Sequence, residues 1–249
     1  MQLIDTHCHI HEPTYPLNRE EVIKNAHSAG VTRLLCVGTN EESSAQAVAF
    51  AEAHEGVYAT IGVHPHDTKD GWEKIEALAG RQGVVGVGEI GLDYFYTHSP
   101  REMQIQALEA QIDLALRYNL PIVFHVREAF EDFWPIFDTF SGIRGELHSF
   151  TDSNKNLEEG LKRGLFIGVN GISTFTKDER QKAMFAAIPL ERMLLETDAP
   201  FLTPMPFRGK VNEPAFVRNV ADFHAKSRGL LIEEVADATT ANANALFAL

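Results

Sequence analysis

The chain has 249 residues, of which 22 are basic and 35 acidic, so its formal net charge is -13. This charge excludes a broad basic surface for nucleic acid, because the molecule as a whole repels phosphate backbones and any nucleic-acid contact must be local. Two cysteines exclude a disulfide framework and favour the cytoplasm, and we see neither a signal peptide nor an apolar stretch long enough to span a bilayer.

Short apolar runs rich in β-branched residues alternate with helical patterns along the chain. The candidate strands are, in order, LIDTH, RLLCVG, VYATIGV, VVGVGE, PIVFHV, RGELHSF, LFIGV and RMLLET. Residues 101–118 place apolar side chains on one helical face, and residues 212–228 and 231–249 predict two closing helices separated at Gly229. Eight such units without a linker predict an α/β protein with a (β/α)8 TIM barrel, formed by a single domain over residues 1–249.

Metal-ligand residues appear at the start of the chain. His7 and His9 are two residues apart in LIDTHCHI, so on a strand both side chains project from the same face and Cys8 points the other way. Two imidazoles then converge on one point. By itself this pattern is equally compatible with two polar residues at a strand end.

The same type of residue ends other predicted strands. His64 follows VYATIGV, Glu89 follows VVGVG, His125 follows PIVF, His148 follows RGEL, and Asp198 follows RMLLET. Active sites of (β/α)8 barrels lie at the C-terminal ends of the strands, so this shared position indicates one site.

Four histidines and two carboxylates exceed what one tetrahedral ion binds, and they suit two divalent ions with a bridging carboxylate. The predicted metal ligands are His7, His9, Glu89, His125, His148 and Asp198. This mixed imidazole and carboxylate set is compatible with Zn, Mn, Ni or Mg, so the metal stays open.

The chain resembles the TatD family of metal-dependent hydrolases over nearly its whole length. The motifs that carry the resemblance are DTHCH, GVHP, GEIGLDY, HVREA, HSF, ETDAP and RGKVNEP. The resemblance implies a TIM barrel of the amidohydrolase type and, for several members, a deoxyribonuclease that removes nucleotides from a 3′ end. It also places the family's ligand motifs on the six residues named above.

Two segments depart from the usual family pattern. The chain has His148-Ser-Phe-Thr-Asp152 where the family is closer to HCFSG, and His125-Val-Arg127 where it is closer to HSR. The ligands are retained, while Asp152 adds a carboxylate and Val126 removes a hydroxyl near them. Both changes bear on substrate preference.

Glu89 and Asp198 are the predicted catalytic carboxylates. We interpret Glu89 as the bridging ligand, because a carboxylate between the apolar flanks VGVG and IGLD would be costly without a partner. Asp198 would bind one metal and orient or deprotonate water, although an Asp before Pro200 is also typical of a turn. Glu196 would face the same way and act as a supporting group or a structural charge.

Substrate contacts are expected from His64, Arg127, Arg208 and Lys210. Arginine can grip a phosphate with its planar fork and lysine acts as a point charge, while the segment RGKVNEP can equally be a plain loop into the last helices. Tyr94, Phe95 and Tyr96 could stack on a base, although packing is the commoner role of aromatic residues after a strand.

The remaining histidines and the cysteines carry no predicted function. His11, His27, His54, His98 and His224 lack a strand-end position, so we expect them at the surface. Cys36 lies within an apolar strand and Cys8 faces away from the ligands, so neither is expected to be a nucleophile.

These observations predict a metal-dependent hydrolase. The preferred hypothesis is a cytoplasmic, monomeric exonuclease that uses two divalent ions (Mg, Mn or Zn) on the ends of single-stranded DNA. The ligands themselves specify only metal-activated water, so hydrolysis of an ester or amide, such as the aminoacyl bond of a charged tRNA, stays open. A metal-binding barrel without turnover is a third alternative, and the presence of Asp198 argues against it.

Overall fold

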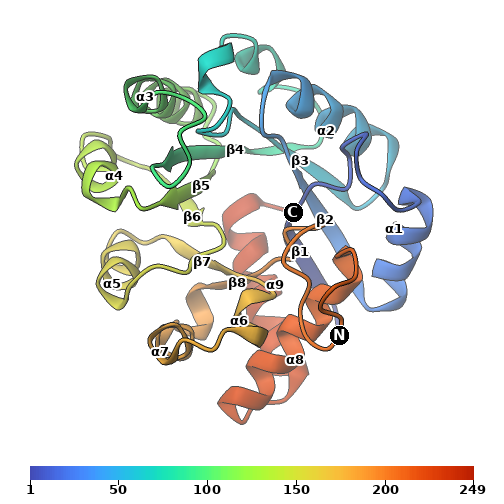
Figure 1. Ribbon diagram of the computed structural model, residues 1–249. Helices are drawn as coiled ribbons and strands as arrows, with labels where there is room; N and C mark the ends of the chain where they lie inside the picture. The colour runs from blue at the N-terminus through green and yellow to red at the C-terminus, as the bar shows by residue number, and fades with distance from the viewer. The chain divides into compact units, whose positions relative to one another are not determined.

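The computed structural model describes all 249 residues and contains one eight-stranded sheet. The strands are β1 Leu3–Cys8, β2 Val31–Val37, β3 Val57–Ile61, β4 Val84–Asp93, β5 Ile122–Arg127, β6 Gly145–Leu147, β7 Phe166–Val169 and β8 Met193–Leu195. Their order in the sheet is their order in the chain, and adjacent strands run parallel (Figure 1). The predicted eight strands and the (β/α)8 topology are confirmed.

Helices connect most successive strands. They are α1 Arg19–Ser28, α2 Glu41–Ala53, α3 Arg101–Arg117, α4 Phe130–Phe137, α5 Asn154–Lys162, α6 Ile172–Phe175, α7 Glu179–Ala187, α8 Val217–Arg228 and α9 Ile232–Phe247. Between β3 and β4 the chain forms only two 3-10 turns, η1 Thr68–Asp70 and η2 Ile75–Leu78, and two others, η3 Leu190–Arg192 and η4 Pro214–Phe216, precede β8 and α8. The closing helices are confirmed, with Pro214 starting η4 and Gly229 ending α8 in a left-handed conformation.

Contacts divide the chain into two compact units, and the first comprises Met1–Leu35 and Ser149–Leu249. In this unit β7 pairs with β8, and a parallel bridge joins Cys8 to Ala199, so the first strand lies beside the segment that follows the last one. Helix α9 packs on β1 and β8. The side-chain amide of Asn242, on α9, fixes this packing by donating to the carbonyl oxygens of Leu190 and Met193, at 2.9 and 2.8 Å.

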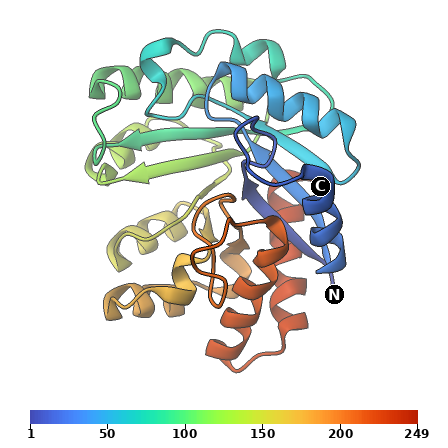
Figure 2. The same ribbon diagram turned by 45° about the vertical axis from the view of Figure 1, so that its right-hand side comes forward.

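The second unit comprises Cys36–His148 and is built around β4. This strand pairs with β3 and β5, and Figures 1 and 2 show β4 and β5 as neighbouring arrows. Gly91 lies on β4 directly opposite His125, where an added Cβ would overlap the His125 carbonyl oxygen. Only glycine therefore permits this close approach, which brings the end of β4 against the end of β5.

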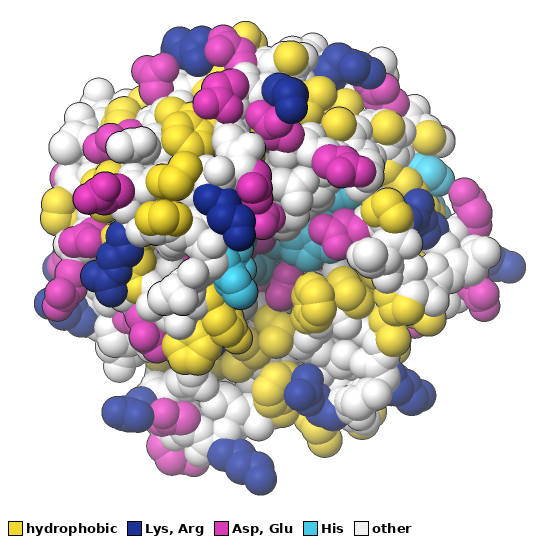
Figure 3. Space-filling view, turned by 45° about the horizontal axis from the view of Figure 1, so that its top comes forward, with side chains coloured by type: hydrophobic (Ala, Val, Ile, Leu, Met, Phe, Trp, Pro, Cys, Tyr) yellow, Lys and Arg dark blue, Asp and Glu magenta, His cyan; other side chains and the backbone are white.

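The lengths of the helices and the charges on one face of the molecule bear on its possible partners. None of the helices is long and apolar enough to cross a membrane. On the face drawn in Figure 3, Lys and Arg side chains are interspersed with Asp and Glu rather than gathered in one stripe. This mixed distribution agrees with the local nucleic-acid contacts expected from the net charge.

Candidate metal centre

His7, His9 and Asp198 form a cluster in the first unit. His7 is on β1, His9 follows that strand, and Asp198 follows β8. The backbone joins the two segments, because the amide of Asp198 donates to the His7 carbonyl and the amide of His9 donates to the Ala199 carbonyl, both at 2.8 Å. The His-x-His pair and the aspartate, which are about 190 residues apart in sequence, are thus held side by side.

The donor atoms of this cluster have the spacing of ligands around one ion. The two Nε2 atoms are 3.2 Å apart, and Asp198 Oδ1 lies 3.7 Å from His7 Nε2 and 3.3 Å from His9 Nε2. Ligands about 2.1 Å from a tetrahedral Zn²⁺ lie ~3.4 Å from one another. Both histidines are buried, and Asp198 adopts a left-handed backbone with φ of 57°, as functional residues often do. These three residues fit a divalent ion.

The buried carboxylate of Asp5 stabilises the segment that carries Asp198. Asp5, on β1, accepts hydrogen bonds from the hydroxyl and the amide of Thr197, at 2.6 and 2.8 Å. Burial raises the pKa of Asp5 to about 8, although the Thr197 bonds oppose that rise. Because Thr197 directly precedes Asp198, these bonds from Thr197 to Asp5 fix the backbone that positions Asp198. The sequence analysis missed this pair, although Asp5 lies two residues before His7 and therefore on the same strand face.

Glu196 has a structural position in the same unit. Its Oε1 accepts from the amide of Ser149 at 2.8 Å and from the side-chain amide of Asn170 at 3.1 Å. Glu196 is fully buried, and these bonds join the end of β8 to the segments that follow β6 and β7.

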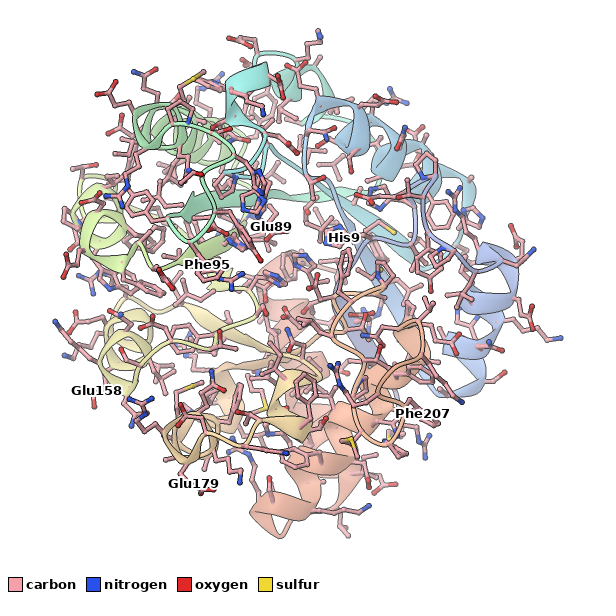
Figure 4. All side chains as sticks on the ribbon, viewed as in Figure 1. His9, Glu89, Phe95, Glu158, Glu179 and Phe207 are labelled. Carbon is pink, nitrogen blue, oxygen red and sulfur yellow. The ribbon has the colours of Figure 1, made fainter.

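Glu89 is the centre of a second cluster, in the second unit. It lies on β4, as labelled in Figure 4, and is buried. Its Oε1 atom is 2.8 Å from His125 Nδ1, 3.6 Å from His64 Nε2 and 3.7 Å from His148 Nε2. Donor atoms of Glu89, His64 and His125 lie close enough together to hold an ion. A carboxylate surrounded by three imidazoles fits the predicted metal-binding role.

His64, which the sequence predicted as a substrate contact, lies within the Glu89 cluster, with its Nε2 atom 3.6 Å from Glu89 Oε1. Burial lowers the pKa of His64 well below its ordinary value, and charge on His125 lowers it further. The imidazole is therefore neutral, which is the form that binds a metal. No local pattern could separate a ligand from a substrate contact here, because Pro65 and His66 also permitted a simple turn.

Asp93 orients His125, and the sequence analysis missed it. Asp93 Oδ2 is 2.9 Å from His125 Nε2 and 3.0 Å from His66 Nε2. Histidines that bind metals commonly donate their other N–H to a carboxylate, which fixes the ring. With Nε2 held by Asp93, His125 directs Nδ1 toward Glu89. The predicted strand VVGVGE ended at Glu89, whereas β4 continues to Asp93. The available signal was the motif GEIGLDY, in which Asp93 lies four residues beyond Glu89.

The hydrogen bond between Asp93 and His125 affects the pKa of both residues. Burial alone would raise the pKa of Asp93, but hydrogen bonds from His125, the Tyr96 amide and His66 together lower it. Burial would likewise lower the pKa of His125, whereas its bonds to Asp93 and Glu89 raise it. Asp93 is consequently an ionised acceptor, which is the state that can orient a neighbouring imidazole.

The predicted cationic contacts Arg127, Arg208 and Lys210 are exposed. Arg127 ends β5, two residues beyond His125, and its guanidinium lies 3.9 Å from the centre of the Phe95 ring. Arg208 lies 3.9 Å from the Phe175 ring and donates to the Thr203 carbonyl. Lys210 lies 5.2 Å from the Phe207 ring. None of the three forms an ion pair, so their charges stay available.

Of the two departures from the family pattern, Asp152 has a local structural role. Asp152 accepts hydrogen bonds from the Ser153 amide and the Asn156 side chain, at 2.7 and 2.6 Å, at the start of α5. It is exposed and acts at the helix terminus rather than on a ligand. Val126 is part of β5.

Two of the five histidines expected at the surface are buried instead. His11 and His224 are 2% and 1% exposed, so the expectation was wrong for both. Burial lowers the pKa of His224 to about 3, and its Nε2 lies 3.1 Å from the Ser173 hydroxyl. Helical position alone could not reveal this, because α8 turns His224 inward together with Val220 and Ala221. His27, His54 and His98 are at least partly exposed.

The family model described as TatD related DNase matches residues 4–248. The chain belongs to this family. The uncharacterized metal-dependent hydrolase YabD of Bacillus subtilis is 39% identical over 98% of each chain. The 3′-5′ ssDNA/RNA exonuclease TatD of Citrobacter rodentium is 37% identical, with 93% of this chain and 92% of that one covered. The crystal structure of YJJV, a TatD homologue from Escherichia coli K12, matches with a TM-score of 0.91 and 30% identity over 99% of this chain and 98% of that one.

Family membership makes the protein a metal-dependent hydrolase and confirms the resemblance found in the sequence. As a TatD-family enzyme it has the (β/α)8 barrel fold, which it shares with an amidohydrolase structure from Saccharomyces cerevisiae at a TM-score of 0.87 and 21% identity. The non-catalytic alternative is thereby dismissed.

Proposed function

We propose that this TatD-family hydrolase is an exonuclease that removes nucleotides from the ends of single-stranded DNA, starting at the 3′ end. The observation that carries the proposal is the pair of donor clusters, His7 with His9 and Asp198, and Glu89 with His125 and His148. Each has the donor types of a divalent site, and all of these residues except Glu89 lie close to the C-terminal end of a strand of one parallel sheet. Glu89 lies within β4, four residues before the strand ends at Asp93. In the proposal each cluster would hold a divalent ion, with Asp198 as the carboxylate ligand of the first and Glu89 as that of the second.

Divalent ions bound by these residues would supply the positive charge that attracts a phosphate oxygen and lowers the pKa of water. The chain's own groups do the remaining work. Asp198 accepts the proton of the attacking water, and Asp93 holds the ring of His125 in place. Arg127, Arg208 and Lys210 contact the phosphates that flank the scissile bond. His64 lies close enough to Glu89 to bind the same ion as His125.

The proposal that the substrate is the end of a DNA strand rests on the charge of the protein. A protein that neutralises many phosphates of a duplex needs a basic track, and a net charge of -13 argues against one. One terminal nucleotide demands far less, namely a scissile phosphate at the metal centre and one or two further phosphates on nearby cations. The exonuclease name of the relative from Citrobacter rodentium supports the same substrate class.

The test compares closed circular single-stranded DNA with a linear oligonucleotide of similar composition, over a series of salt concentrations. We expect cleavage of the linear strand only, with a shallow salt dependence that reflects few phosphate contacts. Efficient cleavage of the circle, or a steep salt dependence, would contradict exonuclease action. Carboxyl ester, amide and aminoacyl-tRNA substrates, assayed in parallel with Mg, Mn and Zn, test the alternative hydrolase activities.

We further propose that the enzyme works as a monomer in the cytoplasm, as one domain. Both cysteines are buried and neither forms a disulfide, in keeping with a reducing compartment.

A further inference from the structure

We propose that Phe95, Tyr96 and Arg127 form a nucleotide-binding platform, which stacks on a base of a single strand and holds an adjacent phosphate. The inference rests on the proposed nuclease function and extends it, because it assigns recognition of the base to named residues. The platform is defined by these three residues. Phe95 and Tyr96 follow β4, and Arg127 ends β5.

The aromatic rings of the platform are exposed, unlike most large apolar side chains of this unit. Phe95 is 48% and Tyr96 42% accessible to solvent, and their ring centres are 4.7 Å apart. The phenylalanines of the neighbouring helix α4, Phe130, Phe133 and Phe137, are buried. Packing therefore explains the α4 rings but leaves the two exposed ones without a structural role. Exposed rings are the usual surface on which single-stranded nucleic acids stack their bases.

The cation of the platform is uncommitted. The guanidinium of Arg127 lies 3.9 Å from the centre of the Phe95 ring and 5.1 Å from that of Tyr96, and this group forms neither a hydrogen bond nor an ion pair. Arg101, which lies 4.0 Å from the Tyr94 ring, is the other arginine in this state. A guanidinium stacked on a ring keeps its N–H groups free at its edges, where they can donate to a phosphate in a fork. Both uncommitted arginines thus adjoin the residues 94–96.

The platform is rigidly joined to the metal-ligand candidate His125. Asp93 Oδ1 accepts from the amides of Phe95 and Tyr96, each at 3.0 Å, while its Oδ2 binds His125 Nε2. The amide of Tyr94 donates to the carbonyl of Arg127 at 2.9 Å. Figure 4 shows Phe95 on the segment beyond the strand that carries Glu89. One carboxylate therefore positions both the ligand and the platform, so a nucleotide bound here lies next to the reacting phosphate.

The space beside Tyr96 is large enough for a base. Tyr94, Tyr96, His98, Ser99 and Arg101 are among the residues that line a cavity of about 390 Å³. This volume lies within the range of small-molecule sites. His98 stacks on Tyr96 with an interplanar angle of 25° and a centre distance of 5.5 Å, so one face of the Tyr96 ring is already covered.

The experiment measures binding by fluorescence anisotropy with metal-free enzyme, using a labelled thymidine hexanucleotide and an abasic strand with the same number of phosphates. Phe95→Leu should weaken binding of the hexanucleotide by roughly 5- to 150-fold, the worth of one stacked base, and leave binding of the abasic strand unchanged. Arg127→Gln should weaken binding of both strands by the same factor, because it removes a phosphate contact. With metal present, Phe95→Leu should raise KM more than it lowers kcat.

The matched control is Tyr118→Leu. Tyr118 is 41% exposed and has Arg117 5.8 Å from its ring, but it lies at the far end of α3, so neither strand should lose affinity. The platform is refuted if Phe95→Leu binds the hexanucleotide as the wild type does, or loses affinity for both strands equally. Failure of the proposed function would look different, because the wild-type enzyme would then hydrolyse no DNA strand. The anisotropy comparison would still show whether the platform binds a base.

Discussion

Replacing Asp93 by Asn tests whether this carboxylate orients His125, a proposed metal ligand. Each carboxylate oxygen accepts two hydrogen bonds, Oδ1 from the amides of Phe95 and Tyr96 and Oδ2 from the rings of His66 and His125. The carboxamide keeps one acceptor oxygen and turns the other into a donor. The variant would therefore lose one pair of hydrogen bonds in either orientation of this side chain. Because the two backbone amides can only donate, we expect the oxygen to stay with them and the bonds to His66 and His125 to be lost.

The expected effect follows from the number and kind of these bonds. A hydrogen bond to a charged group contributes about 1.5–3 kcal/mol, so loss of two costs roughly 3 kcal/mol or more in a side chain that is buried. Asp93 is 1% exposed, so water cannot replace the lost acceptor. Loss of the carboxylate partner of a metal-binding histidine typically lowers metal affinity by about 10- to 100-fold. We expect Asp93→Asn to show both effects.

The assay combines calorimetric titration of metal-free enzyme with Zn²⁺ or Mn²⁺ and urea unfolding of the same preparation. The control is Asp113→Asn on α3, whose side chain is 63% exposed and pairs with Arg117 on the surface. A surface pair contributes about 0–1 kcal/mol, so the control should keep its metal affinity and nearly all its stability. If Asp93→Asn lowers stability but binds metal with wild-type affinity, Asp93 supports the fold and does not orient His125.

Three further predictions concern the metal, the general base and pH. Chelation should abolish hydrolysis and a divalent ion should restore it, whereas full activity with the metal content confirmed as nil would contradict a metal-dependent site. Asp198→Asn should retain much of the metal but lower turnover by about 100- to 10,000-fold, because the amide oxygen can still bind metal but cannot accept a proton; a near-normal rate would remove Asp198 from the mechanism. Because burial lowers the pKa of His224 to about 3, the unfolded state binds a proton below pH 6.5 that the folded state does not, so the free energy of unfolding should fall by up to ~1.4 kcal/mol per pH unit between those values. His224→Gln should reduce this slope in urea unfolding at pH 7.0 and 5.0, and an unchanged slope would show that other groups cause it.

The positions of the predicted metal ligands illustrate what local sequence can determine. Strand direction and the alternation of side chains are local properties, so His7 and His9 could be placed on one strand face from their spacing. The chain order of strands and helices then predicted the (β/α)8 topology, and with it the shared edge at which ligand residues from distant segments end. Family motifs such as GEIGLDY carried the same information in another form.

Tertiary structure alone decided which residues support those ligands. The bonds from Asp93 to His66 and His125 depend on the register that pairs Gly91 with His125 and Asp93 with Arg127, and no local pattern specifies that register. The same pairing brings Arg127 against Phe95, two residues that the sequence placed on separate segments. The burial of His224 depends on which face of α8 meets the rest of its unit. Contacts between strands and helices that are far apart in sequence are selected by packing of the whole chain, so residues whose roles depend on them can be recognised only once the chain is folded.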